Sequence, residues 1–375
     1  MTKTTLFSPI TLRSLEFANR IVVSPMAQYS ADEGGHATPW HSMHLGNLAV
    51  SGAGLVFTEA TAVEPGGRVS PQCLGIWSDE QVTGLRQTVA FCRRYGQARL
   101  GMQLAHAGRK GSVTVPWEKQ RSLDARHGGW PVKSACEWPY PGRPIPQALD
   151  KDGLKQVREA FAAAARRAAQ AEFDLIELHC AHGYLLNSFL SPLANGRTDG
   201  YGGSLANRMR YPLEVFEAVR AAWPEGSPLG VRISATDWTD GGWSIEDSVA
   251  FASELKARGC DYVCASSGGI SPTQKIPLGA GYQVPFAEQI RRESGMTTMA
   301  VGLITQPQQA EDVLVAGGAD FVALGRGMLY DPRWAWHAAE HFGEEVYFPP
   351  QYERAHPSMR RSDFSIAFRE QPAAR

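Results

Sequence analysis

Two histidines and a tyrosine, which are common in catalytic sites, lie close together in the segment 179–184: His179, His182 and Tyr184. Histidines three residues apart on a regular strand would face opposite ways, but where a strand breaks into a turn both can converge on one point. Such a pair has three possible functions: a metal site, a base paired with a nucleophile, or two donors that hold a carbonyl oxygen. Two structural histidines with satisfied hydrogen bonds are the alternative without function.

A second group of residues is suited to binding an anion. The segment Gly325-Arg326-Gly327 and the more distant Gly302 each follow an apolar run. Glycine lets backbone N–H groups approach an anion closely, and arginine adds charge-assisted hydrogen bonds. We interpret these residues as a phosphate site, with a tight turn and a surface arginine as the alternative. A phosphate site favours a nucleotide-like cofactor over a metal, which would need a third ligand such as Glu59 or His106.

Two more polar side chains lie at or near the ends of apolar runs. Arg232 could stabilise negative charge on a ligand there. The alternative to this ligand-binding function is an ion pair between Arg232 and a carboxylate such as Glu59. Gln103 carries an amide that suits paired donor and acceptor contacts with a planar heterocycle.

Eight short apolar runs, mostly apolar on both faces, could position these groups as buried parallel strands. Segments with helix signals separate them. Ser244 and Asp247 form a predicted capping box, and Gly259 ends that helix. Residues 305–308 predict a second box, and Asp152 precedes a helix whose apolar face spans 154–168. The predicted strands are 21–24, 55–58, 100–104, 175–178, 229–233, 262–265, 298–301 and 321–324.

This alternation predicts an α/β fold, a single (β/α)8 TIM barrel over residues 1–342. A Rossmann sheet would need a Gly-x-Gly-x-x-Gly turn after its first strand, whereas residues 24–29 read Ser-Pro-Met-Ala-Gln-Tyr. A barrel needs roughly 250 residues, which leaves room for a loop insertion or lid at 106–150 and a C-terminal extension at 343–375. Because function in this fold collects at the C-terminal strand ends, most of the polar residues named above belong to one rim.

Composition limits the partners. With 43% hydrophobic and 20% charged residues and a formal net charge of −1, the sequence gives no electrostatic reason to expect nucleic acid or an anionic membrane. We find no signal-peptide core at the start and no apolar run of the ~18 residues that a membrane span needs. Cys260 and Cys264 are close, but no second pair accompanies the six scattered cysteines, so we expect no metal site and a reducing cytoplasm.

Several motifs in combination resemble the Old Yellow Enzyme family, in the bacterial branch that contains the xenobiotic reductases and the thermophilic-like ene reductases. The resemblance runs from about Leu6 to about Arg354, nearly the whole chain. The motifs are Asn19-Arg20 leading into Ser24-Pro25-Met26, the segment Gln103–Lys110, the segment 177–185, the segment Arg197–Arg208 and Gly325-Arg326.

The resemblance implies FMN bound at the strand C-termini. Separate residues would contact the flavin ring and the phosphate of FMN. His179 and His182 would donate hydrogen bonds to the carbonyl oxygen of the substrate. Tyr29 would line the substrate pocket, and Tyr184 would be the proton donor, with water as the alternative donor. The ring would contact Ser24, Pro25, Met26, Ala27, Ala60, Gln103 and Arg232, and the phosphate Gly302, Gly325 and Arg326.

The implied activity is that of an FMN-dependent ene reductase. NADPH or NADH would deliver hydride to the flavin, which would pass it to the activated C=C bond of an α,β-unsaturated carbonyl or nitro compound. Two other classes remain open: a metal-dependent TIM-barrel hydrolase that uses His179 and His182, and a non-catalytic flavin-binding protein.

Two further expectations come from comparison with this branch. Ala27 stands where the branch usually has a cysteine beside the flavin, so we expect bound FMN with a shifted potential. Residues 349–354 resemble the segment that inserts an arginine into the neighbouring subunit's site. We therefore expect a homodimer or a homotetramer in which Arg354 contacts the neighbour's substrate, the alternative being a basic tail on the protein's own surface.

Overall fold

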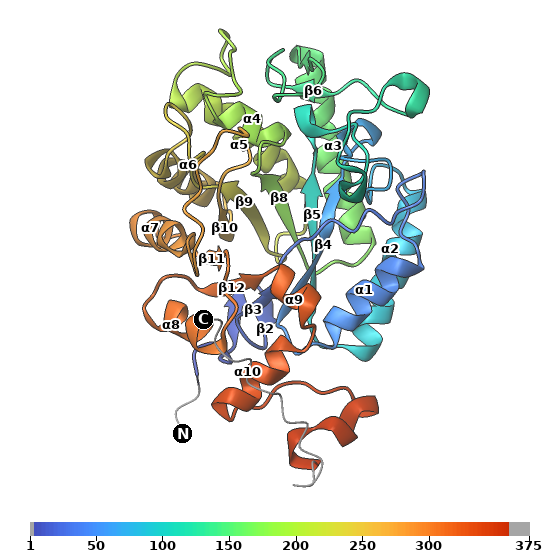
Figure 1. Cartoon of the computed structure of the whole chain (residues 1–375), viewed down its shortest axis with the longest axis vertical. Helices are drawn as coiled ribbons and strands as arrows, with labels where there is room; N and C mark the ends of the chain where they lie inside the picture. The colour runs from blue at the N-terminus through green and yellow to red at the C-terminus, as the bar shows by residue number, and fades with distance from the viewer. Residues whose placement is uncertain (1–3, 360–375) are drawn as a thin grey trace.

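The computed structural model describes residues 4–359 as a closed barrel of eight parallel strands surrounded by helices (Figure 1). The predicted α/β fold class and all eight predicted strands are confirmed. Around the barrel the order is β10-β11-β12-β3-β4-β5-β8-β9, which is chain order closed on itself. The strands are β3 (Ile21–Val23), β4 (Leu55–Ala62), β5 (Arg99–Ala105), β8 (Leu175–Cys180), β9 (Leu229–Ser234), β10 (Tyr262–Ser266), β11 (Thr298–Val301) and β12 (Phe321–Leu324).

Strand β8 shows how the sequence forms a doubly covered barrel. All six of its residues are buried. Ile176 and Leu178 pack in the cluster between barrel and helices, whereas Leu175 belongs to the inner cluster with Phe57 and Tyr262. Because side chains alternate along a strand, the residues two and four positions after Leu175 also point into the barrel. These residues are Glu177 and His179, so β8 directs polar groups inward.

The helices form the outer ring, with α1 and α2 on one side of the barrel in Figure 1 and α6, α7 and α8 on the other. Their bounds are α1 (Pro39–Ala49), α2 (Glu80–Tyr95), α3 (Lys151–Gln170), α4 (Leu185–Leu190), α5 (Leu205–Ala222), α6 (Ile245–Ala257), α7 (Val284–Ser294), α8 (Pro307–Val315), α9 (Arg326–Tyr330) and α10 (Trp334–Phe342).

Most predicted helix signals are confirmed, and two need correction. Ser244 and Asp247 form the capping box of α6, and Gly259 follows that helix at a φ of 83°. Helix α3 begins two residues earlier than expected, because the carboxylate of Asp150, not Asp152, accepts the N–H of Gly153. The box predicted at 305–308 is wrong: α8 begins after Gln306 with no side-chain cap.

A short antiparallel hairpin covers the N-terminal end of the barrel. It consists of β1 (Ile10–Leu12) and β2 (Leu15–Phe17). Leu12 and Phe17 belong to the inner cluster, and the Phe17 ring meets that of Phe321 edge-on at 5.4 Å between centroids. Apolar side chains thus fill this end, which leaves the opposite end, where the strands finish, for polar chemistry.

The insertion at 106–150 contains only short elements, and a partly buried network of hydrogen bonds to a carboxylate ties it to the barrel. Glu64 accepts from His106 at 2.8 Å and from Lys133 at 2.7 Å. The segment lies beside α4 at one end of the molecule in Figure 1, whereas the chain after α10 lies at the other end. Its elements are η2 (Gly108–Lys110), η3 (Pro116–Glu118), η4 (Ala125–His127), β6 (Lys133–Ser134) and β7 (Gln147–Ala148); elsewhere lie η1 (Pro65–Gly67), η5 (Pro350–Ala355) and η6 (Pro357–Met359).

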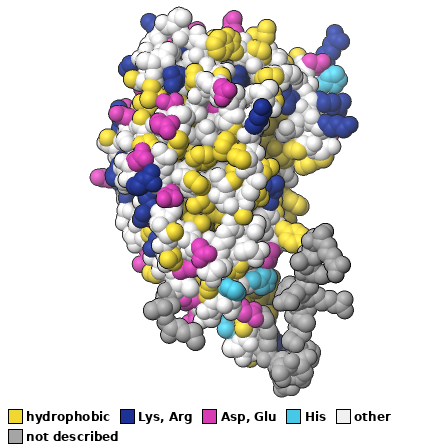
Figure 2. Space-filling view, turned by 60° about the vertical axis from the view of Figure 1, so that its left-hand side comes forward, with side chains coloured by type: hydrophobic (Ala, Val, Ile, Leu, Met, Phe, Trp, Pro, Cys, Tyr) yellow, Lys and Arg dark blue, Asp and Glu magenta, His cyan; other side chains and the backbone are white. Residues whose placement is uncertain are grey.

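Acidic and basic side chains are interspersed over much of the face shown in Figure 2, and hydrophobic side chains reach the surface across its middle. Among residues 4–359, no helix has the length and apolar content that crossing a membrane requires. The extension expected at 343–375 is described as far as residue 359, and its remainder lies outside the described residues.

Candidate active site

A cavity of about 270 Å³ opens where β11, β12 and β3 end. Most of the residues predicted to bind a cofactor line it together, although they come from distant parts of the sequence. Ser266, Tyr282 and Gln283 also line it, and sequence reasoning did not select them. The predicted residues in its wall are Ser24, Pro25, Met26, Arg232, Gly302, Gly325 and Arg326.

The charge of this cavity favours an anion. Of the described residues that line it, Arg232 and Arg326 are basic and none is acidic. Gly325 separates β12 from α9, which begins at Arg326, so the backbone N–H groups of Arg326 and Gly327 have no partner within the helix, and both residues lie in the cavity wall. Gly302 has a φ of 123°, which favours glycine, and a Cβ there would meet Gln283 at 2.6 Å. These features fit a phosphate group.

Two buried polar atoms in the cavity wall have no hydrogen-bond partner among residues 4–359: Ser24 Oγ and Arg232 Nε. Buried polar groups are normally satisfied, so two in one cavity wall indicate a ligand that satisfies them. The alternative pairing of Arg232 with Glu59 is wrong. Glu59 instead lies 3.2 Å from His41 Nε2 and accepts the N–H of Gln28 at 3.0 Å.

The other three predicted cofactor residues lie outside this wall. Ala27 is exposed on the loop after β3. Ala60 and Gln103 pair across β4 and β5, where the register shifts between Phe57 and Ala60. The Gln103 side chain is buried, and its Nε2 donates to Glu177 Oε1 at 2.8 Å. Gln103 is therefore an inward-facing amide held by a carboxyl group, a partner that sequence reasoning did not identify.

The two histidines converge, as expected where a strand breaks into a turn. His182 has a φ of 60°, a strained value for a residue other than glycine. His179 Nε2 lies 3.2 Å from His182 Nδ1, and His182 Nε2 lies 2.7 Å from Ser266 Oγ. His179 Nδ1 accepts the N–H of Ala181 at 3.1 Å. A neutral His179 therefore carries its proton on Nε2 and donates to His182, which in turn donates from Nε2 to Ser266.

Both imidazoles are held neutral. Burial, reinforced by the positive charges of Arg232 and Lys110, lowers the pKa of His179 to about 3. Burial and Arg232 likewise hold the pKa of His182 well below its ordinary value. Each histidine can therefore act as an N–H donor at neutral pH, and neither is suited to act as an imidazolium acid.

Tyr184 and Tyr29 lie on either side of this group in the sequence, and the structure brings only Tyr184 against a histidine. Its ring meets that of His179 edge-on at 4.9 Å, and burial raises its pKa above the ordinary value, so the hydroxyl stays protonated. Tyr29 has a φ of 51° and meets Trp117 of the insertion at 5.9 Å. Arg354 is exposed on η5.

Lys110 also lies in this group, and the sequence indicated it only as part of the motif Gln103–Lys110. Its Nζ donates to the carbonyl oxygens of His182 at 2.8 Å and Gly269 at 2.9 Å, and it lies over the rings of Tyr140 and Tyr184. Burial lowers its pKa to about 8. Its position seven residues after Gln103 could have indicated that Lys110 belongs to the site. Its two acceptors are backbone oxygens, which no sequence motif reveals.

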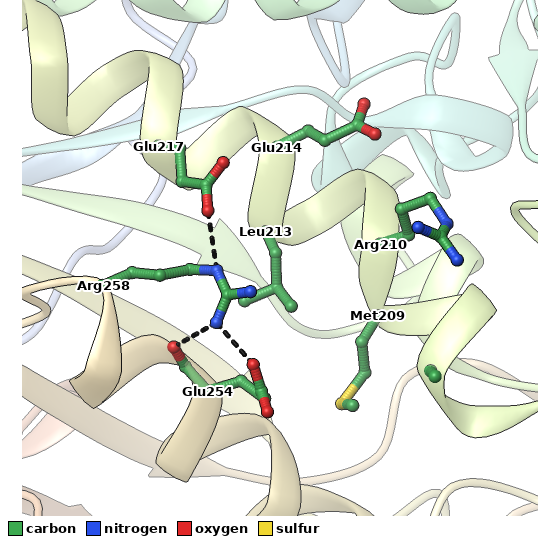
Figure 3. Close-up of a pocket in the computed structure, with 8 residues that line it drawn as sticks. Met209, Arg210, Leu213, Glu214, Glu217, Glu254 and Arg258 are labelled. Carbon is green, nitrogen blue, oxygen red and sulfur yellow. Dashed lines mark hydrogen bonds and ion pairs between the residues drawn. The ribbon is translucent and has the colours of Figure 1, made fainter.

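A larger groove on the outer surface carries no comparable chemistry (Figure 3). It lies between α5 and α6, and the charge of Arg258 is already paired. Arg258 donates to Glu217 at 2.7 Å and to Glu254 at 2.5 Å. Among residues 4–359, no group of three or more His, Cys, Asp or Glu side chains gathers as a metal site would require.

Comparison with known proteins identifies the family of the chain. Residues 5–345 match the NADH:flavin oxidoreductase / NADH oxidase family. The chain belongs to this family. An NADPH dehydrogenase of Geobacillus sp. (strain WCH70) is 46% identical over 353 residues, 94% of this chain and 98% of that protein. One of Bacillus subtilis (strain 168) is 42% identical over 350 residues, 93% and 98%. The resemblance found in the motifs is confirmed.

Solved structures agree with this family. Morphinone reductase in complex with tetrahydroNAD has a TM-score of 0.76 at 26% identity and covers 93% of this chain and 94% of its own. A 2-naphthoyl-CoA reductase shares the fold at a TM-score of 0.82 and 22% identity, over 91% of this chain and 52% of its own. As a family member the chain is a flavin-dependent oxidoreductase whose cofactor is FMN, and family membership decides against the metal-dependent hydrolase.

Proposed function

We propose that this flavoprotein is an ene reductase, which reduces the activated C=C bond of α,β-unsaturated carbonyl or nitro compounds, xenobiotics among them, with NADPH or NADH as reductant. The observation that carries the proposal is the pair His179 and His182, both neutral N–H donors, joined through Ser266 to the wall of a cavity suited to an anionic cofactor. The relatives named NADPH dehydrogenase support NADPH as the reductant.

In this proposal the cavity residues hold FMN. Arg326, Gly302 and Gly325 bind the phosphate, and Ser24 and Arg232 satisfy their unpaired atoms on the ring system. Pro25, Met26, Ala27, Ala60 and Gln103 complete the surroundings of the ring. Bound FMN supplies hydride transfer, which no side chain can provide.

The protein groups act on the substrate. His179 and His182 donate hydrogen bonds to the carbonyl or nitro oxygen, where negative charge develops as hydride reaches the β-carbon. Their mutual hydrogen bond must open for this, because His182 Nδ1 occupies the donor of His179. Tyr184 supplies a proton to the α-carbon, and Tyr29 lines the pocket.

A spectroscopic experiment tests this function. Purified protein should be yellow, should be bleached anaerobically by NADPH or NADH, and should regain its colour when 2-cyclohexenone is added. Protein that is bleached but not reoxidised by enones or nitroalkenes would support a flavin-binding protein without this activity. Colourless protein that cannot be reconstituted with FMN would refute the whole assignment.

We also propose a homodimer or a tetramer of dimers in which Arg354 reaches the neighbouring site. Arg354 is exposed, and Figure 1 places the chain after α10 at the end of the molecule away from α4. Apolar side chains are exposed on α1, α2 and α9, which suits a subunit contact: Met43 51%, Phe91 43%, Leu329 47% and Tyr330 90%. Sedimentation at micromolar concentration tests this, and a monomer would contradict it.

The compartment we propose is the cytoplasm. All six cysteines are free, and five of them are buried. Free thiols suit a reducing compartment, where NADPH and NADH are also generated. Fractionation of cells that produce the protein would test this placement.

A further inference from the structure

A carboxyl group is buried one layer deeper in the barrel than the histidines. Glu177 lies two residues before His179 on β8, and its side chain is 1% exposed. Its Oε1 accepts from Gln103 Nε2 at 2.8 Å, and its Oε2 has no hydrogen-bond partner among residues 4–359. A buried carboxyl with half its capacity unused is costly, so its presence calls for a function.

The groups that face this carboxyl come from neighbouring strands. Arg232 on β9, two residues beyond the position that pairs with Glu177, supplies positive charge. Tyr262 and Cys264 on β10 and Cys180 on β8 also interact with Glu177, as does Cys260 just before β10. Burial keeps these thiols and the Tyr262 hydroxyl neutral. The charge balance of this layer therefore depends on Glu177 and Arg232.

Burial raises the pKa of Glu177 to about 7, although the positive charge of Arg232, the hydrogen bond from Gln103 and the neighbouring hydroxyl of Tyr262 oppose the rise. The carboxyl group can therefore exist in either state near neutral pH. Arg232 also lines the cofactor cavity, so a change of charge on Glu177 acts on the same cation that faces the ligand.

We propose that Glu177 is a positioning residue for the flavin reaction: it fixes the amide of Gln103, balances the charge of Arg232 below the cavity, and thereby sets the midpoint potential of bound FMN. The inference depends on FMN lying in the cavity as placed under the proposed function.

The orientation part follows from hydrogen-bond chemistry. An amide can present either its oxygen or its nitrogen to a ligand, and a carboxyl oxygen without a proton, such as Oε1 when a neutral Glu177 carries its proton on Oε2, accepts but cannot donate. Glu177 therefore binds the nitrogen of Gln103 and leaves the amide oxygen and one N–H for the ring. Without that acceptor the amide could flip and exchange the two groups.

The electrostatic part follows from the charge that reduction adds. Two-electron reduction puts negative charge on the ring next to Arg232, and an ionised Glu177 opposes it. The carboxyl group therefore takes up a proton more readily when the flavin is reduced. Reduction is then coupled to protonation of Glu177 above neutral pH, and uncoupled at pH 6, where the group is already protonated.

The test is a spectroelectrochemical titration of the holoenzyme between pH 6 and pH 9, for the wild type and Glu177→Gln. The substituted amide could keep a hydrogen bond to Gln103 but carries no charge. We expect the two midpoint potentials to coincide at pH 6 and to diverge at pH 9, where the variant should be easier to reduce by about tenfold in equilibrium constant, or about 30 mV for a two-electron couple.

Two further variants separate the parts of the proposal. Glu177→Leu removes the acceptor as well as the charge, and we expect it to weaken FMN binding about tenfold, measured by titrating apoprotein with FMN. Glu311→Gln is the matched control: Glu311 is also buried, but it accepts from the N–H groups of Thr5 and Leu6 away from the cavity. Its potential should follow that of the wild type.

If both proteins bind FMN and the difference between their midpoint potentials is the same at every pH, the inference is overturned. The proposed function would remain intact. Wild-type protein without flavin would instead refute the proposed function. Should Glu177→Leu fail to fold, the pH dependence of Glu177→Gln still decides the electrostatic part.

Discussion

The two ends of the active-site rim are built in opposite ways. At the cofactor end Ser24 Oγ and Arg232 Nε are buried without partners, and Arg326 forms no ion pair with any residue between 4 and 359. At the substrate end His179 and His182 satisfy one another, and Ser266 completes the chain. Unsatisfied groups suit a resident cofactor that supplies their partners, whereas a closed chain suits a substrate that comes and goes.

The difference has an energetic consequence. An orphaned buried polar group costs about 1–3 kcal/mol, so the proposed placement of FMN predicts that bound cofactor stabilises this end. The substrate end has no such deficit, because its donors are used internally between turnovers. A substrate oxygen must therefore compete with an existing hydrogen bond, which limits substrate affinity but preserves the transition-state contact.

The largest effect should come from breaking the substrate end. His182→Ala removes one donor to the developing negative charge, and loss of one such donor costs about 10²–10³-fold in rate. We expect that loss in the rate of flavin reoxidation by an enone, followed by stopped flow, with the FMN spectrum unchanged. Ser266→Ala serves as the contrast because it frees the Nε2–H of His182. A rate for His182→Ala close to that of the wild type would show that the histidines do not hold the substrate oxygen.

The next effect should come from the cofactor end. Arg326→Ala removes a charge-assisted contact to phosphate, worth about 1.5–3 kcal/mol, so the FMN dissociation constant should rise about 10–100-fold. Fluorescence titration of apoprotein with FMN measures this. Arg258→Ala, in the outer groove of Figure 3, is the matched control and should bind FMN as the wild type does. Equal affinities for both variants would place the phosphate elsewhere.

A pH experiment tests how the insertion is held over the substrate end. Although burial opposes it, the hydrogen bonds from His106 and Lys133 lower the pKa of Glu64 from 4.5 to about 2. A depressed pKa contributes stability above the unfolded value, and this stability is lost as pH falls from about 4.5 towards 2. Glu64→Gln should therefore be less stable than the wild type at pH 7 by about 1–3 kcal/mol, and the difference should shrink with acidification.

Urea unfolding at pH 7 and at pH 3 measures both quantities. Glu214→Gln, on the outer face of α5, is a control whose stability difference should be small at both pH values. A difference for Glu64→Gln that stays constant with pH would show that the ionised Glu64 does not anchor the insertion.

The fold could be predicted from sequence because its signals are local. Eight apolar runs mark the strands, and the Ser244–Asp247 box marks the start of α6. The box at 305–308 failed because α8 begins at Pro307, which places Gln306 and not Thr305 at the N-cap. Residue types thus located the elements to within about a turn.

The site could be predicted only in part. Arg326 and His182 could be selected because they follow predicted strands, and the barrel brings the C-terminal ends of all its strands to one rim. The partners could not be named, because they depend on register and depth. Glu177 meets Gln103 since β5 and β8 pair in that register, and Glu59 meets His41 of α1 instead of Arg232. Lys110 binds backbone carbonyl groups, which carry no residue type to recognise.

The smallest effect should come from a position outside the cavity wall. Ala27 is exposed on the loop after β3. The residue that follows it, Gln28, is held by a hydrogen bond from its N–H to the carboxylate of Glu59. Its methyl group can neither donate nor accept a hydrogen bond. A thiol in Ala27→Cys could bond weakly to the flavin, and a hydrogen bond of about 0.5–1.5 kcal/mol corresponds to about 10–30 mV for a two-electron couple.

Spectroelectrochemistry of wild type and Ala27→Cys measures the shift at one pH, and Ala27→Ser tests whether any polar group suffices. The direction tells which redox state the thiol favours: a higher midpoint potential means that it stabilises the reduced flavin more than the oxidised flavin. Because the loop position is fixed by Glu59, the change should leave FMN affinity within about twofold, a difference of only ~0.4 kcal/mol. An unchanged midpoint potential would show that residue 27 does not tune the flavin. The properties of the site would then depend on the cofactor end and the substrate end alone.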